Sequence, residues 1–489
     1  MDVRAQNEPA DEPTLDPGEL TAAECFPGDT ERRRNSVRAD CPVHGFRLPE
    51  SQSIGGRLSP LFAIAGRMLP GLSAKSQIPD HQRPPLLSST PWFGPTPSIR
   101  HHPYDLLSEG ARHCGPVFRF EIFGKMANAV SGPLALELAK NSEALGLDRK
   151  GIFEPFFRVT GVPIFSLEGE EHERLRRLVR FGYTRGTIAP FVGRISQTVR
   201  ETVADWPADL ILLPHMSDVA IRAMAAAVSP KQIPIDWTEM GETGELGMMV
   251  TVRQRSRFTL RLPRMKRAKR NTIAAIDPII RQHREGLTKD DPLPWMIDAF
   301  IAAEADGQTL DDAGIRGGVT YALIAAYIYL GRQALFMLIE ALRDPRTLAV
   351  LNKEVDTAFE KGALTAETLR RMPTLRALFV EANRRYPLLP GMPYETTRQT
   401  DVGGFTLGAN ELVILTGVPG HFDGQNYGCP WSFDQERVRP PRKEHRAPGA
   451  FAPWGFPPRS CLAIGLCELV TTTIVATLLH ELDFTIANK

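Results

Sequence analysis

The 489-residue sequence predicts a protein that is mainly α with small β-sheets. The strongest observation is segment 309–345, whose roughly thirty almost wholly apolar residues indicate one long helix buried on all sides. Most of the chain after residue 115 shows further helical periodicity, with few strands between the helices. Strand signals are short: 116–124, 127–132, and 394–415, where glycines separate two strands.

Composition is that of an ordinary globular protein, with 42% hydrophobic and 24% charged residues. A formal net charge of +1 gives no overall attraction to nucleic acid or to an anionic membrane. The six cysteines lack the dense, regular spacing of a disulfide scaffold, which favours a reducing compartment. The acidic, Pro-rich start does not look like a signal peptide. We therefore expect a cytoplasmic protein that does not bind nucleic acid.

The chain is expected to form one large domain over residues 86–489, preceded by a partly disordered N-terminal extension over 1–85. Within the extension, 58–74 is apolar but too short to span a membrane. It could at most lie on a membrane surface, and a docked helix is favoured. The basic run 253–270 has nine positive and no negative residues and is expected to be a solvated face, with membrane or nucleic-acid contact as the alternative.

Three predicted helices contain residues that point to a function. The first, 169–182, is strongly basic, and the second is the long apolar helix, for which Thr309 and Asp312 form a possible capping box. The third, within 375–391, places Glu381 and Arg384 three residues apart on one helical face before prolines end it.

A lone cysteine, Cys461, stands in the Gly/Pro-rich stretch APWGFPPRSCLAIG at the start of an apolar helix. Its residue type alone allows a buried structural thiol, half of a disulfide, a nucleophile or a metal ligand. The order Glu381-Ala-Asn-Arg384, Tyr386-Pro387, FDQERV with Arg437, and then Cys461 resembles the cytochrome P450 family of heme-thiolate enzymes. The resemblance covers roughly residues 100–485 and implies a heme held between the long central helix and the cysteine loop with its helix.

The resemblance implies roles for particular residues. Cys461 would be the axial ligand of heme b, because a thiolate pushes electron density onto the iron. Glu381, Arg384 and Arg437 would form a charge-paired structural cluster under the heme face; an exposed salt bridge is the alternative. The residues expected to bind the propionates or to shape the ligand loop are His172, Arg176, Arg398, Arg459, Trp454 and Ala463.

The sequence departs from the family at two points of the active site. Pro457 and Ala463 occupy positions where the family's ligand loop has a glycine and a small residue, so we expect an altered loop path. The acid-alcohol pair that delivers protons should fall at Ile328 and Tyr329, while the nearest upstream threonine is about 13.5 Å away along the helix. The residues expected to line the oxygen side are Ala326, Tyr327, Ile328 and Tyr329. The alternative is that both tyrosines only pack.

The function predicted first is a monooxygenase acting on an apolar small molecule in secondary metabolism or catabolism. Apolar segments at 152–157, 322–329 and 388–394 are the candidate pocket. Electrons would come from a separate ferredoxin- or flavodoxin-type protein, because no flavin or nucleotide-binding fingerprint is found. The missing proton relay and a shortened C-terminal tail favour two alternatives: a redox-neutral or peroxide-driven heme enzyme, or a non-catalytic heme-binding sensor.

Overall fold

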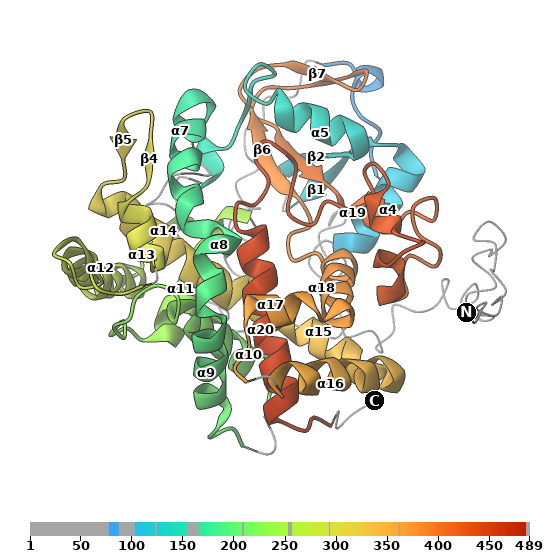
Figure 1. Cartoon of the computed structure of the whole chain (residues 1–489). Coiled ribbons are helices and arrows are strands. Elements are labelled where there is room, and N and C mark those ends of the chain that lie inside the picture. Colours follow the sequence, from blue (N-terminus) through green and yellow to red (C-terminus); the bar gives the residue numbers. More distant parts are fainter. Residues whose placement is uncertain are drawn as a thin grey trace, which may run out of the picture.

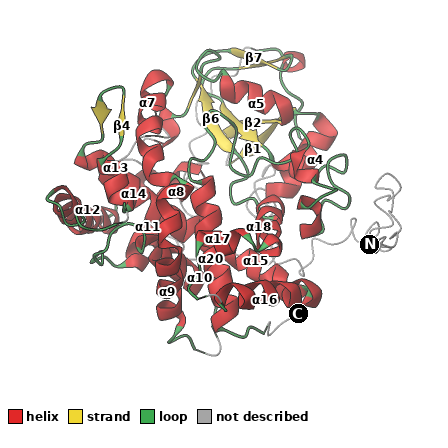
Figure 2. Cartoon of the chain, viewed as in Figure 1, coloured by secondary structure: helices red, strands yellow, loops and turns green. Residues whose placement is uncertain are grey.

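The protein is described by a computed structural model. It describes residues 78–87, 103–122, 125–153, 164, 167–207, 210–252, 257–292, 294–360 and 362–485. Most of the N-terminal extension therefore lies outside the described residues, as do 154–157 of the expected pocket and 253–256 of the basic run. The expected mainly helical fold with small sheets is confirmed: most strands gather in one region of the molecule, one short hairpin lies apart from them, and helices fill the rest (Figures 1 and 2).

The main sheet has five strands in the order β1-β2-β9-β6-β3. Only the pairing of β2 with β9 is parallel. Phe118 and Phe120 of β1 and Ala127 and Ala129 of β2 point into one buried layer, as the period-two alternation of a strand requires. The strands of this sheet are β1 (Val117–Ile122), β2 (Lys125–Ser131), β3 (Leu147–Asp148), β6 (Met392–Thr396) and β9 (Leu412–Thr416). The two hairpins are β4 (Glu304–Ala305) with β5 (Gln308–Thr309), and β7 (Thr400–Val402) with β8 (Phe405–Leu407).

The long apolar segment forms one continuous helical rod in three parts. It runs through α14 (Asp312–Ala325), a π-helical turn η5 (Ala326–Leu330) and α15 (Gly331–Arg343). The expected capping box is wrong: Asp311 caps the helix by accepting a hydrogen bond from the Gly314 amide at 2.7 Å. Thr309 instead pairs with Glu304 in the β4-β5 hairpin, which takes it away from the helix end.

The helical body packs around α20 (Ile464–Glu481), which follows the cysteine loop and is buried along most of its length. Figure 1 shows α20 running through the body beside α9 and α16. Both α20 and the 312–343 rod are long and apolar enough to cross a membrane, but most of each is buried inside the protein, as in a core helix. Residues 482–485, after α20, are irregular.

The other helices surround this core. Before the rod they are η1 (Asp80–Gln82), α4 (Pro103–Cys114), α5 (Gly132–Lys140), α7 (Gly169–Arg180), η2 (Phe181–Tyr183), α8 (Arg185–Ile188), η3 (Ala189–Phe191), α9 (Val192–Val203), α10 (Leu212–Ala225), α11 (Trp237–Val252), η4 (Arg257–Arg261), α12 (Pro263–Arg284) and α13 (Met296–Ile301). After it they are α16 (Pro345–Phe359), α17 (Ala366–Arg370), α18 (Pro373–Arg385), α19 (Val418–His421), η6 (Gln435–Val438) and η7 (Glu444–Arg446). Of the described cysteines, Cys114, Cys461 and Cys467 are free, whereas Cys429 is disulfide-bonded, against the expectation of reduced thiols throughout.

Candidate functional site

The cysteine loop holds Cys461 by its backbone and leaves its sulfur accessible. The Cys461 amide donates to the carbonyl of Trp454 at 2.9 Å, and α20 begins three residues after the cysteine. The amide of Ala463 donates to the Cys461 Sγ at 3.4 Å, so alanine at this position keeps a backbone hydrogen bond to the sulfur. The residue of this loop with a left-handed backbone conformation is Gly455, whose φ is +77°. Pro457 therefore does not need the positive φ that proline cannot adopt.

The surroundings of Cys461 favour its thiolate. Its pKa is lowered to about 7, first by a hydrogen bond from the Cys467 thiol, then by the Ala463 amide and the positive charge of Arg176. The pKa of Cys467 is raised, first because its thiol is hydrogen-bonded to the Cys461 sulfur and then because Cys467 itself is desolvated. Since the thiolate is the form that binds a metal, this environment suits a ligand cysteine.

Three arginines and a histidine converge beside this loop. Arg176, on α7, donates to the Ser460 carbonyl at 2.8 Å, and Arg459 donates to the Leu167 carbonyl at 2.9 Å and pairs with Glu168. The pKa of His172 is lowered to about 3, first by burial and then by the positive charges of Arg459, Arg176 and Arg149. Arg459 therefore lies close enough to repel Arg176 and Arg149, and the three guanidinium charges keep His172 neutral.

This cluster carries more positive than negative charge. Glu168 is the carboxylate that acts on Arg459 and Arg149, and burial raises its pKa, which opposes its ionisation. Burial lowers the pKa of Arg149, whose guanidinium Arg459 also repels. Buried charges are retained when they are paired, so three guanidinium groups around one carboxylate suit a dianionic ligand. The two propionates of the implied heme are such a dianion.

Arg149 was not identified from the sequence. It follows β3, is 1% exposed, and stacks over the rings of Phe153 and Tyr394, whose centroids are 4.8 and 5.3 Å from its Cζ. Two features of the sequence could have indicated it: an arginine directly after a short strand, and an apolar segment directly following it.

Arg398, in contrast, is not brought to the cluster. The chain turns after β6, where the Thr397 amide bonds the Gly146 carbonyl at 2.8 Å, and the exposed Arg398 side chain donates to the Ala144 carbonyl. Trp454 supports the loop: its ring is stacked with Phe379 at 6.2 Å between centroids and meets Phe451 edge-on at 5.2 Å.

The four residues expected on the oxygen side do not share one environment. Ala326 and Ile328 are buried in the main core cluster. Tyr327 lies against α11, where a Cβ on Gly241 would be 2.3 Å from its ring. Its pKa is raised to about 12 by burial and by Glu242 and Glu245. Tyr329 is half-buried at the edge of the core, and its phenol lies near Tyr321.

Tyr321, two helical turns before Tyr329, was also missed by the sequence analysis. Burial raises its pKa first, followed by interaction with Tyr329 and with the Cys461 thiolate, which places Tyr321 on the side of the rod that faces the cysteine. It packs with Ile152, Phe153, Met248 and Met392 in a small apolar cluster. The sequence could not identify this residue, because the apolar periodicity around a tyrosine is the same whether the side chain lines a pocket or packs in the core.

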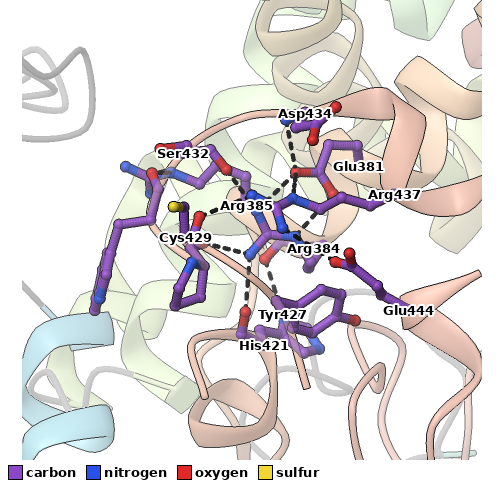
Figure 3. Close-up of polar contacts among 12 residues, drawn as sticks. Glu381, Arg384, Arg385, His421, Tyr427, Cys429, Ser432, Asp434, Arg437 and Glu444 are labelled. Carbon is purple, nitrogen blue, oxygen red and sulfur yellow. Dashed lines mark hydrogen bonds and ion pairs between the residues drawn. The ribbon is translucent and has the colours of Figure 1, made fainter. Parts of the chain in front are cut away.

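Glu381, Arg384 and Arg437 form a buried ionic cluster (Figure 3). Arg384 bonds Glu381 twice, and Arg437 Nε lies 3.4 Å from Glu381 Oε1. All three side chains are almost fully buried. The alternative of an exposed salt bridge is therefore excluded by burial.

Backbone groups complete this cluster. Arg384 donates to the carbonyls of His421, Pro430 and Ser432 at 2.8, 2.6 and 2.9 Å. Arg437 donates to the carbonyls of Gly428 and Cys429 and pairs with Glu444 (Figure 3). The two guanidinium groups thus fix an irregular segment, 421–444, against α18. That segment leads into the cysteine loop.

A family model described as Cytochrome P450 matches residues 254–489. The solved structure of retinoic acid-bound cyanobacterial CYP120A1 superposes with a TM-score of 0.63 at 22% identity, covering 81% of this chain and 92% of that one. This likeness shows the fold.

Curated proteins with similar sequences include a monooxygenase and a hydroxylase. Cyclooctat-9-en-7-ol 5-monooxygenase of Streptomyces melanosporofaciens is 23% identical over 80% of this chain and 87% of its own length. The mitochondrial 25-hydroxyvitamin D-1 alpha hydroxylase of Rattus norvegicus is 31% identical over 35% of this chain and 34% of its own length.

Proposed function

Because the chain belongs to the cytochrome P450 superfamily of heme monooxygenases, we propose that it oxidises an apolar small molecule at a heme b ligated by Cys461. This proposal rests on one observation: the accessible free thiol of Cys461 lies beside a cluster of buried side chains with excess positive charge. Residues 86–489 would form the catalytic domain.

The side chains around Cys461 are suited to bind a heme. The Ala463 amide and the Cys467 thiol stabilise negative charge on the Cys461 sulfur. Arg149, Arg176, Arg459 and His172 would bind the propionates and fix the orientation of the porphyrin. When bound, a heme with a thiolate ligand supplies the chemistry that inserts an oxygen atom into an unactivated C–H bond.

An apolar substrate is supported by the wall that faces this site. The cluster of Ile152, Phe153, Tyr321, Met248 and Met392 offers aliphatic and aromatic surface with one phenol. Such surfaces bind a ligand by burial of apolar area and orient it by few polar contacts. Two relatives carry names of hydrocarbon-rich ligands, cyclooctat-9-en-7-ol and retinoic acid. We therefore propose an isoprenoid-like molecule, consistent with secondary metabolism.

Electrons would come from a separate ferredoxin- or flavodoxin-type protein. Two arginines of the basic helix α7, which could otherwise face an acidic redox partner, already contact another part of the chain. Arg177 pairs with Asp306 at 2.6 Å and Arg174 donates to Gln308 at 2.8 Å, so both contact the β4-β5 hairpin.

A second candidate function is favoured by the oxygen side of the rod. By the spacing of the family's motifs, Ile328 and Tyr329 are expected at the positions of its proton-delivering pair, and a peroxide-driven or redox-neutral reaction would not need that pair. Heme content and the reduced CO spectrum of the full chain test cofactor binding. Product formation with a ferredoxin system and NAD(P)H, with hydrogen peroxide alone, and with neither then separates monooxygenase, peroxide-driven and redox-neutral activity. A heme-loaded chain that converts no isoprenoid under any condition would contradict the proposal and favour a binding or sensor role.

A further inference from the structure

Helix α11 lies unusually close to the rod at its π turn. A Cβ on Gly244 would be 2.4 Å from Ile324, and one on Gly241 would be 2.3 Å from the ring of Tyr327. Figure 1 shows α11 beside α14, and it also contacts η5. Two glycines one helical turn apart therefore let α11 approach the widened turn more closely than any side chain would allow.

Arg332 joins the π turn to α11. In this turn the Gly331 amide bonds the Ala326 carbonyl five residues back. A side chain that donates to a carbonyl of such a turn adds a hydrogen bond that holds its widened geometry. The Arg332 Nη1 donates to the carbonyl of Ile328 at 2.5 Å, and its Nη2 donates to Glu245 Oε1 of α11 at 2.8 Å. The Arg332 side chain is 11% exposed and that of Glu245 is 22% exposed.

The same helix contributes to the apolar cluster proposed above as the wall of the substrate pocket. Met248, three residues after Glu245 and so near it on the helix surface, packs against the cluster of Ile152 and Phe153, as Tyr321 does. A molecule bound at the proposed pocket would therefore contact the helix to which Arg332 is bonded. Tyr329 lies within the π turn itself, two residues before α15 begins.

We infer that Arg332 is a positioning residue: it holds the π turn, and with it Tyr329, and through Glu245 it couples this turn to occupation of the pocket. The coupling step rests on the proposed function, because it assumes that the apolar cluster lines a substrate pocket. The stabilisation of the π turn by Arg332 does not depend on any substrate.

Amide hydrogen exchange of the full-length protein tests the holding step. We expect Arg332→Met to speed exchange of peptides within 326–334 by about tenfold or more, because local opening sets the exchange rate. Arg332→Lys, which can still donate to one of the two partners, should give a smaller increase. The matched control is Arg316→Met, which removes another ion pair of the rod, the one between Arg316 and Asp277 at 2.6 and 2.8 Å. Parent-like exchange at 326–334 in Arg332→Met, or an equal increase there in the control, would overturn the inference.

Glu245→Gln tests the coupling step, because it leaves the Arg332 bond to Ile328 in place. In the heme-loaded parent, an apolar azole such as 4-phenylimidazole should protect peptides of both α11 and the π turn from exchange. In Glu245→Gln it should protect α11 alone, and in Arg316→Met both should stay protected. Joint protection that persists in Glu245→Gln would refute the coupling. An azole that gives no spectral shift in the parent would contradict the proposed pocket, while the exchange result of Arg332→Met still decides the inference.

Discussion

Arg384 binds Glu381 through two parallel hydrogen bonds, Nε to Oε2 at 2.8 Å and Nη2 to Oε1 at 2.7 Å, with both side chains 1% exposed. The Asp434 amide adds a third donor to Glu381 Oε1 at 3.0 Å. Geometry of this quality is what allows an ion pair to persist out of water.

Glu381→Ala should remove about 3 to 5 kcal/mol of folding free energy, because it leaves buried Arg384 without its carboxylate and Arg437 with Glu444 alone. Soluble yield and heme content should fall together. Glu367→Ala is the control: Glu367 also pairs with two arginines, Arg370 and Arg371, but on the surface. It should leave yield and heme content near normal. Equal losses in both variants would contradict the structural role of the buried cluster.

Cys461→Ala should abolish the red-shifted Soret band of the reduced CO adduct, because the thiolate is the source of that signature. Cys467→Ala should retain the band, since its thiol only donates a hydrogen bond to the ligand sulfur. Absorption spectra of the two purified variants check this. A thiolate-type spectrum in Cys461→Ala would show that another residue binds the iron.

Arg149→Met should change stability and heme affinity in opposite directions. Replacing a buried, mutually repelled arginine by an apolar residue removes a desolvation cost from the heme-free chain, so that form should unfold at higher denaturant concentration. Heme affinity should fall about tenfold or more, about 1.4 kcal/mol, if the guanidinium binds a propionate. Arg398→Met, at an exposed residue outside the cluster, should change neither quantity measurably. A heme affinity unchanged in Arg149→Met would exclude that arginine from the cofactor site.

Tyr329→Phe should abolish or divert product formation, because a positioned proton donor contributes typically 10²–10⁴-fold to a step that needs it. Tyr327→Phe should have a smaller effect, since Tyr327 faces α11. Turnover of both variants with the same redox partner decides between the roles. If both turn over like the parent, the tyrosines are packing residues.

His421 predicts an acid-side loss of stability. Its Nε2 accepts from the Ala452 amide at 2.9 Å, which leaves Nδ1–H to donate to the Arg384 carbonyl at 3.1 Å, so the buried ring is neutral. Burial, then the charge of Arg384, lowers its pKa to about 3. Between that value and the unfolded pKa of about 6.5, only the unfolded chain takes up the proton. The free energy of unfolding should fall as pH drops through this window, by at most about 1.4 kcal/mol per pH unit.

His172, whose pKa is also lowered to about 3, adds a second contribution in the same direction. His421→Gln should therefore flatten the pH dependence of the unfolding midpoint between pH 7 and 5 without removing it. A slope equal to the parent's would mean that His421 is already protonated in the folded protein.

Much of the fold followed from the sequence because it depends on local patterns. The apolar rod, strands β1 and β2, and the Glu381-Arg384 spacing on α18 are set by periodicity and by the identity of neighbouring residues. Cys461 was located by the order of motifs along the chain, which a linear sequence preserves.

Only the tertiary structure determined the contacts between segments that lie far apart in the sequence. Arg149 and Arg398 are both arginines next to short strands, yet only Arg149 is buried, because the turn after β6 directs Arg398 to the 144–146 loop. The π turn at 326–330 contacts two glycines of α11 and, through Arg332, Glu245, some eighty residues earlier. Periodicity measures only which face of a helix is apolar, so it could neither locate this turn nor tell that Tyr327 faces α11 while Tyr329 lies near Tyr321.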